Sequence, residues 1–183
     1  MAPDDGITVP AVSENREGVT ITEIGAFYEK EMPRLVMFVR ALSTILDGHA
    51  AADVAQTAFE RALPRWASLR NPKAWLYKVA HHEALARCEA IRREMPADTV
   101  PDRPDQMSAA LAAEWRDEQR EVMAHLQTLA PKQRQVMTWT LAGFHDAQIA
   151  EALGLSTDAV KANRRYARTN LKKRLGPGQR GKR

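Results

Sequence analysis

The apolar positions in the first half of the chain follow a helical period. Between Ile21 and Leu46 they recur at steps of three, four and seven residues, which is typical of one face of an α-helix. Pro33 lies within this stretch and is expected either to kink the helix or to begin a second one. Asp47-Gly48 is typical of a turn. No stretch alternates β-branched and polar residues as a half-buried strand does, so the pattern predicts an all-α fold.

Two further helices are predicted before residue 95. One extends from about residue 50 to 63, and Pro64 ends it because its ring blocks a helix interior. The next begins at Asn71-Pro72, where Asn can cap the helix and Pro suits its first position. This helix reaches about Arg93. Its expected inner face consists of Trp75, Leu76, Val79, Ala80 and Ala86.

Prolines and acidic residues interrupt the helical pattern between residues 95 and 107, which predicts an extended, semi-stiff linker. The first twenty residues combine Pro, Gly and acidic residues without a period, and we expect a disordered acidic tail. Residues 177–183 form a short basic tail. The chain is therefore predicted to fold as two small helical domains, residues 21–94 and 108–176, joined by a Pro-rich linker.

The second domain is predicted to begin with an amphipathic helix near Ser108. Another helix opens at Pro131 and ends before Gly143, and two more span about residues 146–153 and 157–174. The helix that begins near Ser108 has an apolar stripe of Leu111, Trp115, Val122, Leu126 and Leu129.

The last two helices have the spacing of a DNA-binding helix-turn-helix. Asp146 is expected to cap a helix that buries Ile149, and Gly154 can take the left-handed conformation that ends it. Ser156 can cap the next helix, whose Val160 would pack back onto Ile149. A plain helical hairpin with a solvated basic face is the alternative interpretation.

The charge distribution along the chain favours the DNA-binding interpretation. Residues 131–183 hold 12 Lys and Arg against three Asp and Glu, whereas residues 1–107 hold 13 against 16. A basic helical segment of this kind suits a polyanion such as nucleic acid. The second helix of the pair would place its N-terminal part in the major groove and its later charges on phosphates. Its candidate DNA-binding residues are Lys161, Asn163, Arg164, Arg165 and Arg168.

Three blocks of the sequence together carry a family resemblance. Residues 129–136 and 148–154, with Val160-Lys161 and Ala167-Arg168, resemble region four of extracytoplasmic-function sigma factors of the sigma-70 family. Residues 52–63 resemble region 2.2, and residues 70–80 resemble regions 2.3 and 2.4. The resemblance covers about residues 20–175, with the blocks in the family's order.

The resemblance implies a transcription factor that acts as a subunit of RNA polymerase. It implies binding to the clamp helices of the beta-prime subunit, to the beta flap and to promoter DNA, and an anti-sigma factor as partner. The region 2.2 residues that match the family's polymerase contacts are Asp53, Gln56, Phe59 and Leu63. The matching candidates for the melted minus-ten element are Arg70, Asn71, Lys73 and Lys78. The basic residues of the last helix would then bind the minus-thirty-five element.

This sequence also departs from the family pattern. Ala52 and Thr57 stand where acidic residues are common, and Gln148 replaces the usual Glu. In the last helix Asn163 and Tyr166 are among the unusual residues, which leaves the sequence of the minus-thirty-five element open.

Other chemistry finds no support in the sequence. His81-His82-Glu83 lacks the pair of histidines four residues apart that a helical zinc site uses, so we expect no metal and no cofactor. No catalytic motif is present, and we predict that the protein is not an enzyme. No apolar run is long enough to cross a membrane, and the lone Cys88 fits a reducing cytoplasm.

Two rival functions stay open at this stage. The first is a helix-turn-helix regulator that binds an operator without being a polymerase subunit. The second is an enzyme acting on RNA or DNA through a basic arm. Residues 21–94 discriminate against the first, because they resemble region two rather than a ligand-binding or dimerisation domain.

Overall fold

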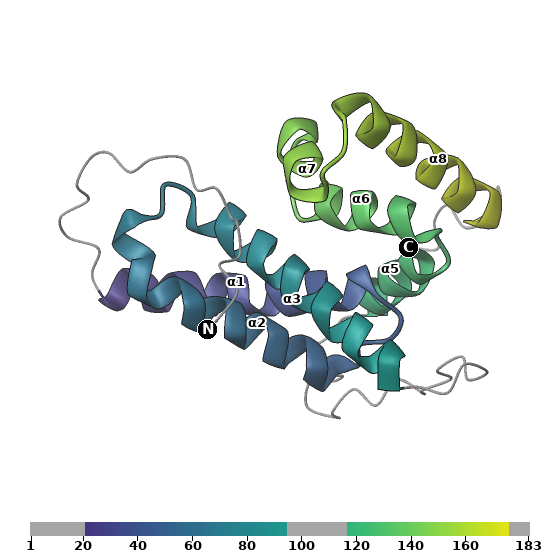
Figure 1. Ribbon diagram of the computed structural model, residues 1–183. Helices are drawn as coiled ribbons and strands as arrows, with labels where there is room; N and C mark the ends of the chain where they lie inside the picture. The colour runs from purple at the N-terminus through teal and green to yellow at the C-terminus, as the bar shows by residue number, and fades with distance from the viewer. Residues whose placement is uncertain (1–20, 95–116, 176–183) are drawn as a thin grey trace.

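The computed structural model describes residues 21–94 and 117–175, and within these ranges the fold is all-α (Figure 1). The predicted tails, the linker and the expected stripe positions Leu111 and Trp115 lie outside the described residues. The first unit comprises α1 (Ile21–Leu42), α2 (Gly48–Ala62), the 3₁₀ helix η1 (Leu63–Ser68) and α3 (Pro72–Glu94). The second comprises α5 (Asp117–Gln127), α6 (Pro131–Leu141), α7 (Asp146–Leu153) and α8 (Thr157–Leu175).

Helix α1 continues through Pro33, so the alternative that this proline begins a second helix is wrong. Its second half is buried on the face that carries Leu35, Val39 and Leu42. Asp47-Gly48 is not a turn. Asp47 is the N-cap of α2, and its carboxylate accepts a 2.8 Å hydrogen bond from the backbone N–H of Ala50.

Helix α3 begins as the sequence predicts. The side-chain oxygen of Asn71 accepts a 3.0 Å hydrogen bond from the backbone N–H of Ala74. The prediction that Ala86 faces the core is wrong, because this residue is exposed. Ala84 and Cys88 are buried instead, since they continue the stripe of Tyr77 and Ala80 at steps of four.

The second unit differs from the prediction at one stripe position. Val122 is 46% exposed, whereas its neighbour Met123 is buried. Met123 and Leu126 point to a small apolar cluster that also contains Ala41 of α1 and Ala167 of α8. The buried side of α5 is therefore determined by its contacts with both units. The sequence of α5 alone does not show which side that is.

The helix-turn-helix forms with one changed cap. His145 is the N-cap of α7 and Asp146 is its first helical residue. Gly154 takes the left-handed conformation at φ 61° that ends α7. The hydroxyl of Ser156 accepts a 3.1 Å hydrogen bond from the backbone N–H of Ala159, as a cap of α8 should. Ile149 and Val160 are both completely buried.

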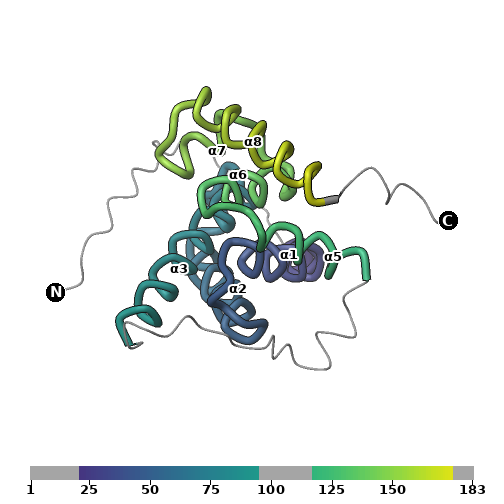
Figure 2. Tube along the Cα trace, turned by 90° about the vertical axis from the view of Figure 1, so that its right-hand side faces the viewer, coloured from purple at the N-terminus to yellow at the C-terminus, as the bar shows by residue number. Residues whose placement is uncertain are grey.

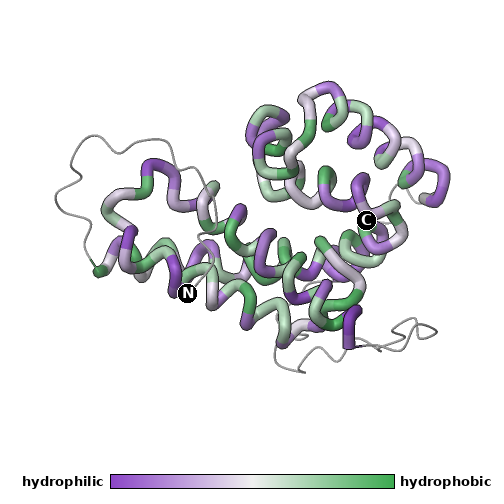
Figure 3. The backbone as a smooth tube through the Cα atoms, in the orientation of Figure 1, coloured by the Kyte–Doolittle hydropathy of each residue, from purple (hydrophilic) through white to green (hydrophobic). Residues whose placement is uncertain are grey.

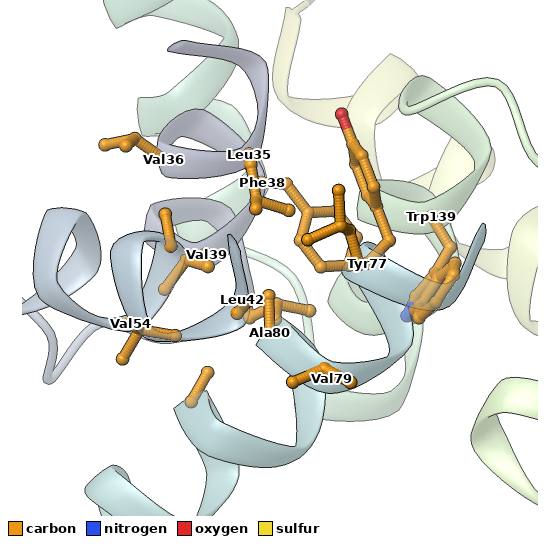
Figure 4. Close-up of a cluster of buried hydrophobic side chains, with 14 of the residues drawn as sticks. Leu35, Val36, Phe38, Val39, Leu42, Val54, Tyr77, Val79, Ala80 and Trp139 are labelled. Atoms are coloured by element: carbon orange, nitrogen blue, oxygen red, sulfur yellow. The ribbon is translucent and has the colours of Figure 1, made fainter. Parts of the chain in front are cut away.

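The two units pack against each other through aromatic side chains. In Figures 1 and 2 helix α6 lies between the first unit and the pair α7–α8, and α1 contacts both α5 and α6. The ring of Trp139 on α6 lies 5.1 Å from that of Phe38 on α1 and 4.9 Å from that of Phe144. Tyr77 of α3 lies 5.1 Å from Phe144 and 4.8 Å from Phe38. Figure 4 shows Tyr77 and Trp139 at the edge of the apolar cluster of α1 and α3.

This packing corrects an expectation about the relative position of the units. The sequence suggests that a Pro-rich linker leaves their positions unfixed. The structure instead places both units in one buried cluster that extends from Leu35 on α1 to Val160 on α8. The physical reason is that α1 and α3 present the rings of Phe38 and Tyr77 to Trp139 of α6 and to Phe144, so that the contact buries apolar surface from both units.

Replacing Gly154 by Ala should lower the free energy of unfolding by about 1–2 kcal/mol, since an L-residue is strained at positive φ. Gly25 is the matched control. It lies within α1, and a Cβ there would meet nothing within 4 Å. Gly25→Ala should leave the free energy of unfolding unchanged or raise it by up to about 1 kcal/mol. Chemical denaturation followed by circular dichroism measures both, and an equal effect of the two changes would contradict this account.

Candidate nucleic-acid interface

The basic side chains of α8 gather on one side of this helix. A shallow groove along it is lined by Lys161, Arg164, Arg165, Arg168, Thr169 and Lys172. Figure 3 shows the predominantly hydrophilic colouring of α8 on the outer side of the molecule. Steps of three and four residues bring these cations onto adjacent turns. Four of the five predicted DNA-binding residues of α8 are thus brought together.

Arg164 has a partner within the protein. Its guanidinium donates to both carboxylate oxygens of Asp146, and the longer of the two hydrogen bonds measures 2.9 Å. Hydrogen bonding to Arg164 lowers the pKa of Asp146 below its ordinary value. The ion pair ties α8 to the first residue of α7, so Arg164 has a role in fixing the angle between the two helices. We expected Asp146 to cap α7 and did not foresee its ion pair with Arg164.

The other candidates on α8 differ in how freely they can reach outward. The side-chain amide of Asn163 donates a 2.8 Å hydrogen bond to the backbone oxygen of Ala159, so it is folded back onto its own helix. Lys161 lies 3.7 Å from the exposed carboxylate of Asp158. The guanidinium of Arg165 stacks 5.3 Å from the ring centroid of Tyr166. Arg165 is exposed, and Arg168 lines the same groove.

Gln148 stands where the family resemblance led us to expect Glu, and it still supports the start of α7. Its side-chain oxygen accepts a 3.2 Å hydrogen bond from the backbone N–H of His145. An amide serves here because the required group is an acceptor for a backbone donor, and charge is not needed.

The region 2.2-like residues divide into surface and core. Gln56 is exposed and accepts a 3.0 Å hydrogen bond from the Tyr28 hydroxyl. Leu63 is 52% exposed, and Asp53 is exposed as well. Phe59 is only 2% exposed and packs 4.8 Å from the ring of Tyr28. Phe59 therefore belongs to the core between α1 and α2, where it holds the surface residues of α2 in place. Its assignment to the polymerase contact stays a prediction.

The candidates for the minus-ten element lie at the start of α3. Arg70 and Asn71 are exposed, and the Asn71 side chain is occupied as the helix cap. Lys73 donates a 3.0 Å hydrogen bond to the backbone oxygen of Ala142 in the second unit. Lys78 forms a 3.3 Å ion pair with Glu151 of α7. Both lysines therefore face the second unit.

The aromatic residues near these lysines have separate roles. Trp75 is half-buried against the core, in agreement with a structural role, and the guanidinium of Arg65 lies 5.5 Å from its ring. Tyr77 is almost fully buried and donates a 3.2 Å hydrogen bond to the carboxylate of Glu31. Burial and the neighbouring Glu31 carboxylate raise the pKa of the Tyr77 hydroxyl.

Two further findings concern the described residues as a whole. Within residues 21–94 and 117–175, no group of three or more His, Cys, Asp or Glu side chains is arranged to hold a metal ion. No helix in these ranges is long and apolar enough to cross a membrane.

Two family models match this chain. The model of sigma-70 region 2 matches residues 27–94, and that of bacterial regulatory proteins of the luxR family matches residues 127–179. The HTH-type transcriptional regulator YhjB of Escherichia coli K12 is 29% identical over 107 residues, 56% of this chain. The chain spans about half the length of this relative, 52%.

Two solved structures share the arrangement of helices. The sigma factor RpoE in its complex with the anti-sigma factor NepR from Bartonella quintana has a TM-score of 0.64 at 21% identity, over 87% of this chain and 100% of that one. CnrH in complex with the cytosolic domain of CnrY has a TM-score of 0.56 at 20% identity, over 86% of this chain and 90% of that one. At these identities the likeness establishes the fold.

The ion pair of Asp146 predicts a dependence of stability on pH. Because the folded protein lowers the pKa of Asp146, the pair stabilises the fold above the carboxyl's ordinary pKa of 3.8. That stabilisation is lost as the pH falls through the lower value of the folded state. Asp146→Asn should therefore lower the melting temperature at pH 6, and the difference from wild type should shrink below pH 4. Asp158→Asn, which alters an exposed carboxylate of α8, is the control. Parallel pH profiles of wild type and Asp146→Asn would contradict this reading.

Proposed function

We propose that this chain is a sigma factor of the sigma-70 family and of the extracytoplasmic-function type. In this role it binds core RNA polymerase and directs it to promoters. The observation that carries the proposal is the presence, in one chain, of a region 2 match over residues 27–94 and a basic helix-turn-helix over α7 and α8. In this role the protein supplies binding surfaces, while the polymerase supplies the chemistry. We expect it to act in the cytoplasm, where the polymerase works.

Each unit has its own task in this proposal. The exposed face of α2 would bind the clamp helices of the beta-prime subunit. The start of α3 would hold the non-template strand of the melted minus-ten element, where basic side chains and a helix N-terminus suit phosphates. The second unit would bind the beta flap and place α8 in the major groove of the minus-thirty-five element.

An anti-sigma factor is the proposed regulatory partner. The similar RpoE structure is a complex with the anti-sigma factor NepR, and the similar CnrH structure contains the cytosolic domain of CnrY. These structures match 87% and 86% of this chain, and the RpoE complex supports an anti-sigma factor as the partner proposed here.

A regulator that binds an operator without polymerase is the second candidate. The luxR-type match over residues 127–179 and the likeness to YhjB favour it. These matches fall on the helix-turn-helix half or cover only part of the chain, and they leave the region 2 match over residues 27–94 unexplained. The sigma-factor proposal accounts for both halves.

Run-off transcription with purified core polymerase tests the proposal directly. A promoter library should yield defined transcripts only when this protein is added. Absence of any protein-dependent transcript, together with sequence-specific binding of the free protein to duplex DNA, would favour the operator-binding regulator.

Replacing Asp53 and Gln56 by Ala should weaken binding to core polymerase by at least tenfold, because both lie one turn apart on the accessible side of α2. Loss of Gln56 removes the acceptor of the Tyr28 hydroxyl, but Tyr28 is 38% exposed and water can replace the bond. The control is Glu89→Ala with Arg93→Ala, an exposed pair on α3. Titration with labelled core polymerase measures both, and equal affinities of the two double variants would refute the assignment of α2.

Arg165→Ala should cost about 1–3 kcal/mol in promoter binding and relax the preference at one or two minus-thirty-five positions. Arg168→Ala should weaken binding evenly across sequences and reduce the salt dependence by about one unit, as loss of a phosphate contact does. Holoenzyme binding to a promoter-variant library at two salt concentrations separates the two effects. If Arg165→Ala weakens every variant equally, Arg165 does not contact bases.

A further inference from the structure

Two of the four minus-ten candidates, Lys73 and Lys78, contact the second unit. The ammonium group of Lys73 donates to the backbone of Ala142 and lies 5.5 Å from the ring centroids of both Tyr77 and Phe144. One turn and a half later, Lys78 is paired with Glu151 of α7. A single-stranded nucleic acid could not contact the Lys73 ammonium group without displacing the backbone that follows α6, and it would have to compete with Glu151 for Lys78.

A histidine lies buried at the same boundary. His81 of α3 is 4% exposed, and its ring lies 5.8 Å from that of Trp139 on α6. Within the described part of the chain, neither ring nitrogen has a hydrogen-bond partner. Burying a neutral imidazole without hydrogen bonds costs some free energy. Burying an imidazolium costs more, because it is a charge whose N–H donors have no acceptor here.

The charged groups around His81 add to this preference for the neutral form. His82 and Lys78 face it from α3, Lys132 from α6, and Glu151 from α7. The single carboxylate among them is paired with Lys78. Burial, followed by the charges of His82 and Lys132, lowers the pKa of His81 to about 4.

We infer that the second unit is an internal cover over the DNA-binding end of α3, and that His81 makes this cover sensitive to protons. With His81 neutral the two units stay packed, and Lys73 and Lys78 are held by the protein itself. With His81 protonated the contact with Trp139 loses stability, and the units separate while each remains folded. The inference rests on the proposed function only in naming promoter DNA as the ligand that is kept away.

The direction of the pH effect follows from linkage. Separation of the units would expose the His81 ring to water and let its pKa rise toward the ordinary value of 6.5, from about 4 in the packed form. The packed form is therefore favoured fully above pH 6.5 and loses this advantage as the pH falls toward 4. Between pH 7.5 and 5.5 the ratio of separated to packed molecules should rise about tenfold.

The distance between the units tests the inference without polymerase or DNA, so its outcome is independent of the sigma-factor proposal. Spin labels are attached at Ala90→Cys on α3 and Thr169→Cys on α8, two exposed positions, in a Cys88→Ala background. The measurement is made on the full chain and on its Glu151→Lys variant. Replacing Glu151 by Lys sets two cations against each other and raises the separated population into the measurable range. Glu121→Lys, on exposed α5, is the matched control.

At pH 7.5 the labelled chain should give one narrow distance, and Glu151→Lys should add a longer component that grows about tenfold at pH 5.5. Adding His81→Phe, which keeps a ring against Trp139 but removes the titrating nitrogens, should abolish the growth. A distribution that does not change with pH, or growth that persists with His81→Phe, would overturn the inference. So would a loss of helical circular dichroism over this pH range, because the inferred transition separates two folded units.

The cover itself is tested by the reactivity of Lys73. Acetylation at pH 7.5 followed by mass spectrometry should modify Lys73 at least tenfold more slowly than Lys30, an exposed lysine of α1 in the same chain. The Glu151→Lys variant should narrow this difference, whereas Glu121→Lys should leave it unchanged. Equal reactivity of Lys73 and Lys30 in the unaltered chain would show that α3 is not covered.

Discussion

The aromatic contacts of α1 and α3 with Trp139 of α6 and with Phe144 are the interactions on which the arrangement of the described residues depends. Tyr77, Trp139 and Phe144 bring together rings from both units, with centroids about 5 Å apart. Burial of these large rings excludes water and is the dominant favourable term in joining the units. The same contacts place the Lys73 ammonium group against the backbone of Ala142. The packing of the two units therefore also determines how accessible Lys73 would be to DNA.

Local features of this fold could be predicted from the sequence, because their causes are local. The cap of α3 by Asn71, the left-handed Gly154 and the cap of α8 by Ser156 each follow from residues within one turn. The basic face of α8 follows from helical periodicity in the same way. The family resemblance added the tasks of the two units, which no local pattern contains.

The errors have a common physical origin in contacts between distant segments. Val122 and Met123 both fit an apolar stripe, and only the docking of α5 beside α1 decides which of them is buried. Asp146 could cap α7, but Arg164 eighteen residues later takes its carboxylate. The packing of the two units is the largest such case, because a Pro-rich linker says nothing about the surfaces that it connects.

We propose that this chain binds promoter DNA at two places, and only as part of the polymerase. Footprinting of one promoter with free protein, with core polymerase and with both decides the matter. The free protein should give no footprint. The complete assembly should give two separate regions, one duplex at the minus-thirty-five element and one melted at the minus-ten element, where unpaired thymines react with permanganate. A single protected duplex site formed by the free protein, unchanged by core polymerase, would show instead that the chain binds DNA without the polymerase.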